Sequence, residues 1–300
     1  ILAPIEKSGN REELFGLLQP EVVLTFGGLV VSKKIKAFLR AYPPATHWHV
    51  DIKKANDTFF CLGKHFKTGP NDFLRGFLDK TIVVESGYKT FWATKREHYR
   101  MQRERYLGKI PFTDLWAFNY ILESIPKNFQ LQLGNSSTVR YAQLFDIDPS
   151  IGVFCNRGTS GIDGSTSTAI GASVYNETPT LLVTGDLSFL YDSNGLWNNY
   201  IRADFRIIVI NNDGGGIFRI LPGKEETQNF NTFFETTHNL NLRSLAELYG
   251  FGYESVAEKE DLKEALYHFY KSSERPKILE VKTPRLLNDK ILLSYFDFIS

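Results

Sequence analysis

Short apolar runs that end in glycine or polar residues recur along the chain, and apolar residues at helical spacing lie between them. In the larger, C-terminal part, the runs predict strands over 129–133, 152–155, 181–184, 206–210 and 277–281. The helices predicted there span about 163–175, 193–201, 243–249 and 260–272. Strands that alternate with helices are typical of a doubly wound parallel sheet, so this part is predicted to be an α/β domain.

The first hundred residues predict a second, smaller α/β unit. Its strands are expected over 21–26, 46–51 and 81–85. A helix is expected over 32–41, where Ile35 and Phe38 share one face. Gly27 and Gly28 lie between the first strand and this helix, an order that suggests dinucleotide binding. The GxGxxG pattern is absent, so that signal is weak.

The segment between the two units indicates helices. A charged run over 95–105 predicts a connecting helix. Thr113 stands before an apolar helical pattern that must stop at Pro126, and it is expected to cap that helix. The fold class is therefore α/β, with two doubly wound parallel-sheet domains.

The stretch 185–222 carries the strongest chemical signal. One apolar run ends in Gly185-Asp186, the next ends in the pair that includes Asn212, and 26 positions separate the acid from this amide. A right-handed βαβ crossover places both strand ends at one edge of the sheet, where ligands of such sheets bind. Carboxylate and amide oxygens beside glycines are typical of a Mg²⁺–phosphate site. An ordinary βαβ unit with turn residues is the alternative, but the joint spacing and the following glycines at 214–216 favour the site.

Composition excludes several classes of function. The chain has 300 residues, of which 42% are hydrophobic and 23% charged, as in soluble globular proteins of about two domains. A net charge of +1 gives no reason to expect a nucleic-acid partner. No apolar run approaches the roughly 18 residues of a membrane span, so no membrane insertion is expected. Cys61 and Cys155 lack CxxC or metal-ligand spacing, which favours reduced thiols in a cytoplasmic protein.

Four segments together resemble the MenD family of the menaquinone pathway. These are the thiamine diphosphate (ThDP)-dependent 2-succinyl-5-enolpyruvyl-6-hydroxy-3-cyclohexene-1-carboxylate (SEPHCHC) synthases. The segments are GNSSTVR at 134–140, NRGTSGIDG at 156–164, GDLS at 185–188 and NNDGGGIFRILP at 211–222. ThDP enzymes in general have glycine where this chain has Leu187, and GDLS is typical of this family. The resemblance is strong over the C-terminal two thirds and weaker over residues 1–100, where it rests on Gly27-Gly28 and the SKK run at 32–34.

The resemblance implies a domain plan. Residues 1–100 would be a central Rossmann-like domain, with a connector to about 110, and residues 111–300 a diphosphate-binding domain. The family's N-terminal pyrimidine-binding domain, which supplies a catalytic glutamate, has no counterpart in this sequence. The chain begins with Ile1, so a fragment that is inactive alone is expected. Since ThDP sites of this superfamily lie between subunits, the full-length enzyme is expected to be a cytoplasmic homo-oligomer, a dimer or tetramer.

The implied reaction is that of a ThDP-dependent transferase. 2-Oxoglutarate is decarboxylated, and the resulting enamine adds to isochorismate by conjugate addition. Asp186, Asn212 and the carbonyl of Gly214 would bind Mg²⁺ or Mn²⁺, and Ser188 would donate to a phosphate oxygen. A helix starting near Asp192 would direct its N-terminal N–H groups towards the anion. The implied cofactor-binding residues are Ser160, Gly161, Ile162, Gly185, Asp186, Leu187, Ser188, Asn212, Gly214, Gly215 and Ile217.

The resemblance also assigns residues around the reacting atoms. The catalytic set is Ile162, Ile217 and Phe218. Ile162 would hold the cofactor in its bent shape, and the other two would shield the carbanion from water. The substrate-binding set is Ser136, Arg140, Arg157, Lys33, Lys34 and Leu221. Both substrates carry two carboxylates, which suit the planar fork of arginine.

Two other functions remain open on the residues alone. One is another ThDP-dependent decarboxylase or carboligase, such as an acetolactate-synthase-like enzyme, whose apolar substrate would not need both Arg140 and Arg157. The other is a non-catalytic cofactor-binding α/β module. Binding of ThDP with Mg²⁺, rather than of NAD, would count against the second.

Overall fold

The computed structural model of the chain describes residues 11–221 and 227–299, and Pro222 of the NNDGGGIFRILP segment lies outside them. The chain divides into two compact units. One holds the described residues up to Tyr106 and those from Ser294 on, and the other holds Leu107–Leu293. Both contain a parallel sheet with flanking helices, so the predicted α/β class is confirmed.

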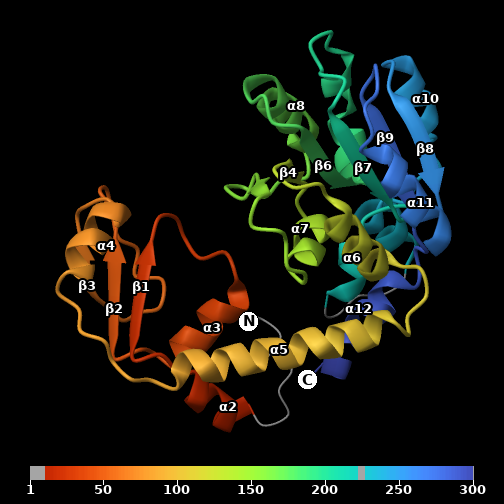
Figure 1. Ribbon diagram of the computed structural model, residues 1–300. Coiled ribbons are helices and arrows are strands. Elements are labelled where there is room, and N and C mark those ends of the chain that lie inside the picture. Colours follow the sequence, from red (N-terminus) through yellow and green to blue (C-terminus); the bar gives the residue numbers. More distant parts are fainter. Residues whose placement is uncertain (1–10, 222–226, 300) are drawn as a thin grey trace. The chain divides into compact units, whose positions relative to one another are not determined.

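The smaller unit contains a three-stranded parallel sheet in the order β1-β2-β3 (Figure 1). Its strands are β1 (Val22–Phe26), β2 (Thr46–Val50) and β3 (Leu62–Phe66). Its helices are α2 (Arg11–Leu18), α3 (Lys33–Ala41), α4 (Pro70–Leu78) and α5 (Tyr88–Leu107). The Ser32 hydroxyl caps α3 by accepting the Ile35 N–H at 3.2 Å. Leu18, Phe38 and Phe59 form its buried core.

The strand predicted over 81–85 is wrong, and β3 occupies the third position instead. Residues 81–85 form no regular structure, and Val83 is 99% exposed. The run is β-branched, which favours a strand, but strand formation depends on neighbours that it lacks here. The connecting helix is also longer than the predicted 95–105, since α5 runs from Tyr88 to Leu107.

The larger unit contains a six-stranded parallel sheet in the order β5-β4-β6-β7-β9-β8. The strands are β4 (Gln130–Leu133), β5 (Gly152–Cys155), β6 (Thr180–Gly185), β7 (Arg206–Asn211), β8 (Gly252–Val256) and β9 (Lys277–Lys282). The chain goes from β4 outwards to β5 and then returns past β4 to β6. The strand order therefore reverses between β4 and β6, the position at which open α/β sheets bind ligands.

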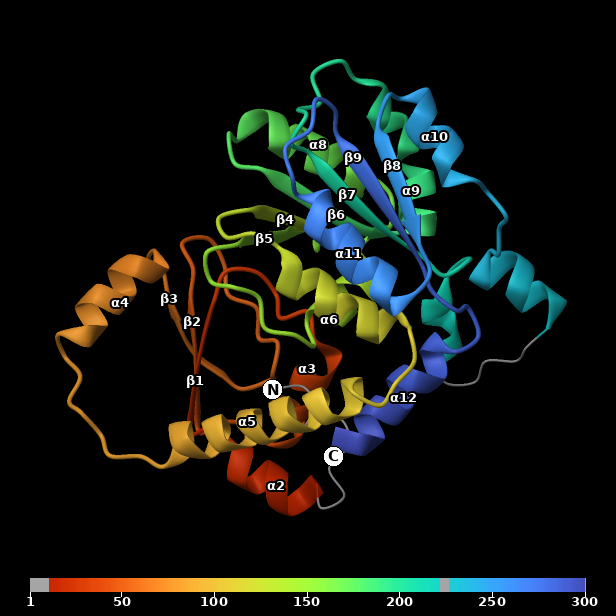
Figure 2. The same cartoon turned by 45° about the vertical axis from the view of Figure 1, so that its right-hand side comes forward.

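Helices cover both faces of this sheet (Figure 2). The helices of this unit are α6 (Asp114–Ser124), α7 (Ser137–Ala142), α8 (Ser165–Tyr175), α9 (Asp186–Tyr191), α10 (Leu242–Leu248) and α11 (Lys259–Phe269). Helix α12 (Asn288–Ile299) begins in this unit, and its residues from Ser294 on belong to the smaller one. One face packs Leu182, Ile207 and Val209 against α8, α9 and α10 in a single buried cluster. In Figure 2, α6 and α11 lie together over the opposite face. Burial on both faces explains why the strands read as continuous apolar runs.

The crossover between β6 and β7 differs from the predicted helix over 193–201. Helix α9 begins directly at Asp186, and a short 3-10 helix, η1 (Ser193–Trp197), follows it. Asp192 occupies the N-cap position of η1, and an anion at the N–H groups of this short helix stays a prediction. The buried Asp192 carboxylate accepts hydrogen bonds from the backbone N–H of Ser167 at 2.7 Å and from the Ser167 hydroxyl at 2.6 Å. Asp192 therefore anchors the start of α8.

The start of α6 also differs in detail. Thr113 occupies the cap position, but its hydroxyl donates to the carbonyl of Pro111 and makes no cap bond. The side chain of Asn288 caps the helix from a distant part of the sequence, accepting the Asp114 N–H at 2.8 Å. Strand β8 and helices α7 and α12 were not predicted. Every helix of the described residues is too short or too polar to cross a membrane.

Candidate active site

A cavity of about 300 Å³ lies at the carboxyl ends of β4, β6 and β7 in the larger unit. These strands are adjacent in the sheet, so the residues that follow them meet at one edge. An added Cβ on Gly134 would lie 2.8 Å from the Thr184 hydroxyl, so only glycine allows this approach of β4 to β6. The predicted residues that line the cavity are Ser136, Ile162, Gly185, Asp186, Leu187, Ser188, Asn212, Gly214, Gly215, Ile217 and Phe218.

Asp186 is buried where β6 ends and α9 begins, with 2% of the residue exposed. One carboxylate oxygen accepts the Leu187 N–H at 2.6 Å and the other accepts the Gly214 N–H at 2.9 Å. The His238 Nε2 lies 3.3 Å from the second oxygen, and its hydrogen bond to Asp186 raises the pKa of this histidine. These contacts fix the carboxylate and connect the β6 end to the glycine loop after β7.

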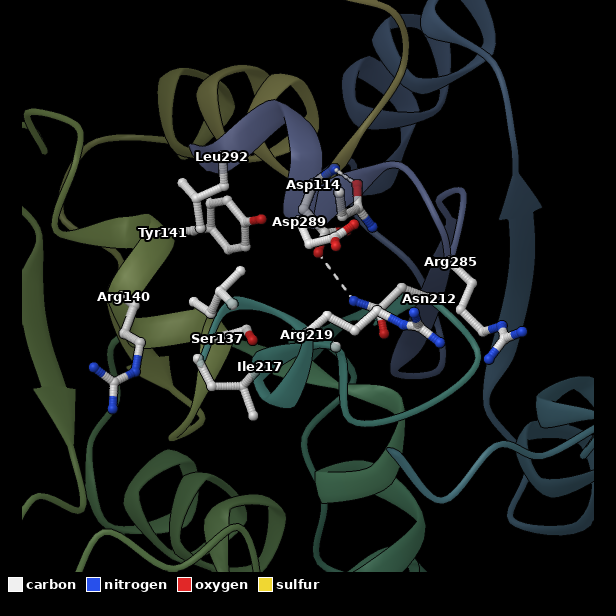
Figure 3. A pocket seen from close by; sticks show the side chains of 13 residues that line it. Asp114, Ser137, Arg140, Tyr141, Asn212, Ile217, Arg219, Arg285, Asp289 and Leu292 are labelled. Atoms are coloured by element: carbon white, nitrogen blue, oxygen red, sulfur yellow. Dashed lines mark hydrogen bonds between the residues drawn. The ribbon is translucent and has the colours of Figure 1, made fainter. Parts of the chain in front are cut away.

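Asn212 lies beside a second buried carboxylate that the sequence did not reveal. Its Nδ2 donates to Asp114 Oδ2 at 2.9 Å (Figure 3). Asp114 also lines the cavity of about 300 Å³. Burial raises the pKa of Asp114 to about 6, and the nearby charge of Asp186 adds to this shift. Among the described residues, Asp186 has His238 as its ion-pair partner and Asp114 has none, so the surroundings of the two carboxylates favour a bound cation.

The glycine loop after β7 is anchored by Glu235. Gly214 has φ +140°, and a Cβ there would lie 2.6 Å from the Glu235 carbonyl oxygen. That oxygen accepts the Gly215 N–H at 2.6 Å. Since the peptide is planar and trans, the Gly214 carbonyl points the opposite way, where it accepts the Gly216 N–H at 3.0 Å with one of its two lone pairs.

Two arginines fix Glu235 in turn. Its side chain is fully buried, and it accepts Arg219 Nε at 2.5 Å and Arg285 Nη1 at 2.8 Å. Arg219 belongs to η2 (Gly216–Ile220), the 3-10 helix that continues the glycine loop. Glu235 ends the π-helix η3 (Phe230–Glu235). Its contacts with Gly215 and Arg219 therefore join η3 to the glycine loop and hold the loop in place. No local pattern in the sequence indicates these contacts, because Glu235 is 16 positions from Arg219 and 50 positions from Arg285.

Apolar side chains form one wall of the cavity. Ile162, Ile217 and Phe218 all line it, and their roles around the cofactor stay a prediction. Ser188 sits in the same place but its hydroxyl donates to the Ile162 carbonyl at 2.5 Å. This hydrogen bond ties α9 to the loop that carries Ile162. Donation from Ser188 to a phosphate oxygen stays a prediction.

The loop before Ile162 holds predicted residues that do not line the cavity. The Ser160 hydroxyl donates to the Arg157 carbonyl, and the Gly161 carbonyl accepts Asn135 Nδ2 at 2.7 Å. Arg157 Nη1 donates to Asn135 Oδ1 at 2.8 Å. Asn135 thus holds both ends of this loop and accounts for part of the hydrogen-bonding capacity of Arg157.

Other predicted substrate residues lie outside the main cavity. Arg140 is exposed and borders a smaller adjoining cavity of about 20 Å³, on the opposite side from Arg285 (Figure 3). Leu221 is 50% exposed and lines neither of these cavities. Lys33 and Lys34 begin α3 in the other unit and are exposed.

The described residues contain no group of three or more His, Cys, Asp or Glu that could hold a metal ion. The predicted ligands are of a different kind, with one carboxylate, one side-chain amide oxygen and one backbone carbonyl. Such oxygen ligands suit a hard divalent cation that also binds a phosphate.

Comparison with known proteins identifies the class of this site. Residues 134–281 match the family described as thiamine pyrophosphate enzyme, C-terminal TPP binding domain. This segment carries Asp186, Asn212 and Gly214, so the larger unit contains the TPP-binding domain of a thiamine pyrophosphate enzyme.

The chain is related along its length to SEPHCHC synthases. It is 55% identical over 299 residues to that of Christiangramia forsetii, covering 100% of this chain and 52% of the relative. The Flavobacterium johnsoniae synthase is 53% identical over 296 residues, with 99% and 52% covered. The Porphyromonas gingivalis synthase is 40% identical over 303 residues, with 98% and 52% covered. The chain spans about half the length of these curated relatives.

Proposed function

We propose that the chain forms the central and diphosphate-binding domains of a ThDP-dependent SEPHCHC synthase. Residues 1–100 are assigned to the central domain and 111–300 to the diphosphate-binding domain. The observation that carries the proposal is the cavity where Asp186, Asn212 and Gly214 meet at the reversal of strand order. Its relatives bear the name of this synthase, and the family match identifies the cofactor as thiamine diphosphate.

The residues present fit the cofactor's diphosphate and its metal. Asp186, Asn212 and the Gly214 carbonyl would hold Mg²⁺ or Mn²⁺ against the phosphates. The fit rests on the two buried carboxylates, whose negative charge the metal would offset, and on the bare glycine backbone beside them. Gly185, Leu187 and Gly215 would complete the contacts to the diphosphate, together with Ser160 and Gly161 of the loop before Ile162.

When bound, ThDP supplies the electron sink for decarboxylating a 2-oxo acid. The chain's own residues then have separate tasks. Ile162 would support the cofactor from below in its bent shape. Ile217 and Phe218 would exclude water from the reacting carbon, which favours carbon–carbon bond formation over protonation.

The proposed substrates are 2-oxoglutarate and isochorismate, both dicarboxylates. Arg140 and Arg157 would bind carboxylates, with Ser136 as a hydroxyl donor beside them. Lys33, Lys34 and Leu221 are proposed to contact substrate as well. We further propose that the full-length enzyme is a cytoplasmic homo-oligomer and that its other half supplies the catalytic glutamate.

Assay of the intact protein with ThDP, Mg²⁺ and isochorismate tests the proposal. Consumption of 2-oxoglutarate with formation of the adduct is expected, and pyruvate should not replace it. Turnover of pyruvate instead would indicate an acetolactate-synthase-like enzyme. Binding of ThDP without turnover of either acid would indicate a non-catalytic module.

A further inference from the structure

We infer that Asp114 is a positioning residue for the metal: its carboxylate fixes the Asn212 amide so that the amide oxygen, and not the nitrogen, faces the cation. This inference rests on the proposed function, in which Asn212 is a metal ligand.

A side-chain amide needs such a partner to act as a ligand. Its two ends are almost the same size, but only the oxygen can bind a hard cation, because the NH₂ end carries positive partial charge. A carboxylate accepts hydrogen bonds and cannot donate them. Asp114 Oδ2 therefore selects Nδ2 of Asn212 at 2.9 Å, and rotating the amide would place two oxygens against each other.

Asp114 is itself held on several sides, so it can impose this orientation. It is 2% exposed at the start of α6, and the Thr283 hydroxyl donates to its Oδ1 at 2.5 Å. Asn288 accepts the Asp114 N–H and donates to the Thr283 hydroxyl at 3.2 Å. Thr283 is tied to the end of β7, since its N–H donates to the Asn211 carbonyl at 3.0 Å. A connected network of this kind gives the carboxylate one position.

The charge of Asp114 supports a functional reason for its burial. None of the ion pairs found in the described residues includes it, and Asp186 lines the same cavity. A buried carboxylate without a cation partner is costly for stability. A divalent ion bound by Asp186 and Asn212 would offset this cost, which explains why a carboxylate and not an amide occupies position 114.

The inference is tested by titrating the intact protein with Mg²⁺ in the presence of ThDP and measuring the Kd for Mg²⁺ by calorimetry. Wild-type protein must first bind ThDP in a Mg²⁺-dependent way, and failure at this step would overturn the proposed function itself. Asp114→Leu removes the acceptor and should raise the Kd for Mg²⁺ about tenfold or more. Asp114→Asn can still offer an oxygen to Asn212, so its Kd should rise much less. Equal effects of the two substitutions would mean that Asp114 acts by charge alone and would overturn the positioning role.

The Asn212→Asp background separates positioning from a purely structural role. A carboxylate at 212 has two equivalent oxygens and needs no orientation, and it would be repelled by Asp114. Adding Asp114→Leu to this background should therefore lower the Kd for Mg²⁺, the reverse of its effect on wild type. A rise of the same size in both backgrounds would contradict the inference.

Two further variants guard against general damage. Asp192→Asn removes charge from a buried carboxylate that bonds Ser167 outside the cavity, so it should lower the Tm and leave the Kd for Mg²⁺ unchanged. If Asp114→Leu does not fold, Thr283→Val removes the donor that holds Asp114 in place. It should raise the Kd by a smaller factor, and an unchanged Kd would count against the inference.

Discussion

The amino and carboxyl ends of the six-stranded sheet both bury charged groups, but they differ in how these groups are paired. At the amino end, Arg206 begins β7 and is 2% exposed. Its guanidinium donates to the carbonyls of Phe269, Ala203, Phe205 and Lys271. A wide hollow of about 620 Å³ opens beside it. At the carboxyl end, Asp186 and Asp114 are both buried; among the described residues His238 is the ion-pair partner of Asp186, and Asp114 has none.

The difference shows that neither burial of charge nor the size of a cavity marks a binding site. The hydrogen-bonding capacity of Arg206 is used by carbonyls of its own domain, so this buried cation offers little to a ligand in the hollow at the amino end. At the carboxyl end, the Asn212 amide oxygen has no donor among the described residues, and negative charge is in excess. The smaller cavity is therefore the one whose chemistry a cation and a diphosphate would complete.

The largest expected effect is on metal-assisted binding at the carboxyl end. Asp186→Ala removes a proposed metal ligand and also the acceptor of the Gly214 N–H. The Kd for ThDP in Mg²⁺ should rise by roughly a thousandfold, or about 4 kcal/mol. Calorimetry of the intact protein measures this change. Asp204→Asn, at the amino end, is the matched control and should leave the Kd unchanged. Near-wild-type affinity of Asp186→Ala would remove the basis for distinguishing the two ends.

The next effect belongs to the amino end and concerns stability alone. Arg206→Met leaves several buried carbonyls without a donor, so the free energy of unfolding should fall by about 3 kcal/mol. Urea unfolding measures this loss, and ThDP titration of the folded fraction should give the wild-type Kd. A raised Kd in a stable Arg206→Met protein would show that the amino end takes part in binding after all.

Gly214→Ala should have an intermediate effect on both properties. Its φ of +140° disfavours any other residue, and the added Cβ would meet the Glu235 carbonyl at 2.6 Å. The free energy of unfolding should fall by about 2 kcal/mol, and the Mg²⁺ affinity should fall as the loop shifts. Gly164→Ala is the control, because its φ is +72° but the space around it is open. It should lose about 1 kcal/mol in urea unfolding and keep its Mg²⁺ affinity. Equal loss of Mg²⁺ affinity in both variants would mean that contact with Glu235 does not matter.

The features that could be predicted from the sequence are those coded by neighbouring residues. The continuous apolar runs at 181–184 and 206–210 predicted the bounds of β6 and β7 to within one residue, because strands buried on both faces need such runs. The polar residues directly after them had to lie at the carboxyl edge of the sheet, which placed Asp186 and Asn212 at one cavity.

The features that were missed depend on contacts between distant positions. Asp114 reaches Asn212 across 98 positions, and nothing near Asp114 in the sequence indicates this contact. The run at 81–85 has the composition of a strand, but β3, with Gly63 and Lys64, takes the place beside β2. Strand propensity is thus overridden by which segment the chain can bring next to the sheet.

The smallest expected effect concerns Ser188, which lies at the carboxyl end but already has a partner. Its hydroxyl donates to the Ile162 carbonyl, so Ser188→Ala removes one internal hydrogen bond and should lower the free energy of unfolding by about 1 kcal/mol. Since the hydroxyl hydrogen is used within the protein, the Kd for ThDP should rise only slightly, through a shift of Ile162. Urea unfolding and ThDP titration on the same variant measure the two quantities. A large rise in Kd with unchanged stability would mean that Ser188 exchanges its partner for a phosphate oxygen when the cofactor binds. In that case, the hydrogen bonds that a side chain makes in the free protein would not decide which groups at this edge bind the ligand.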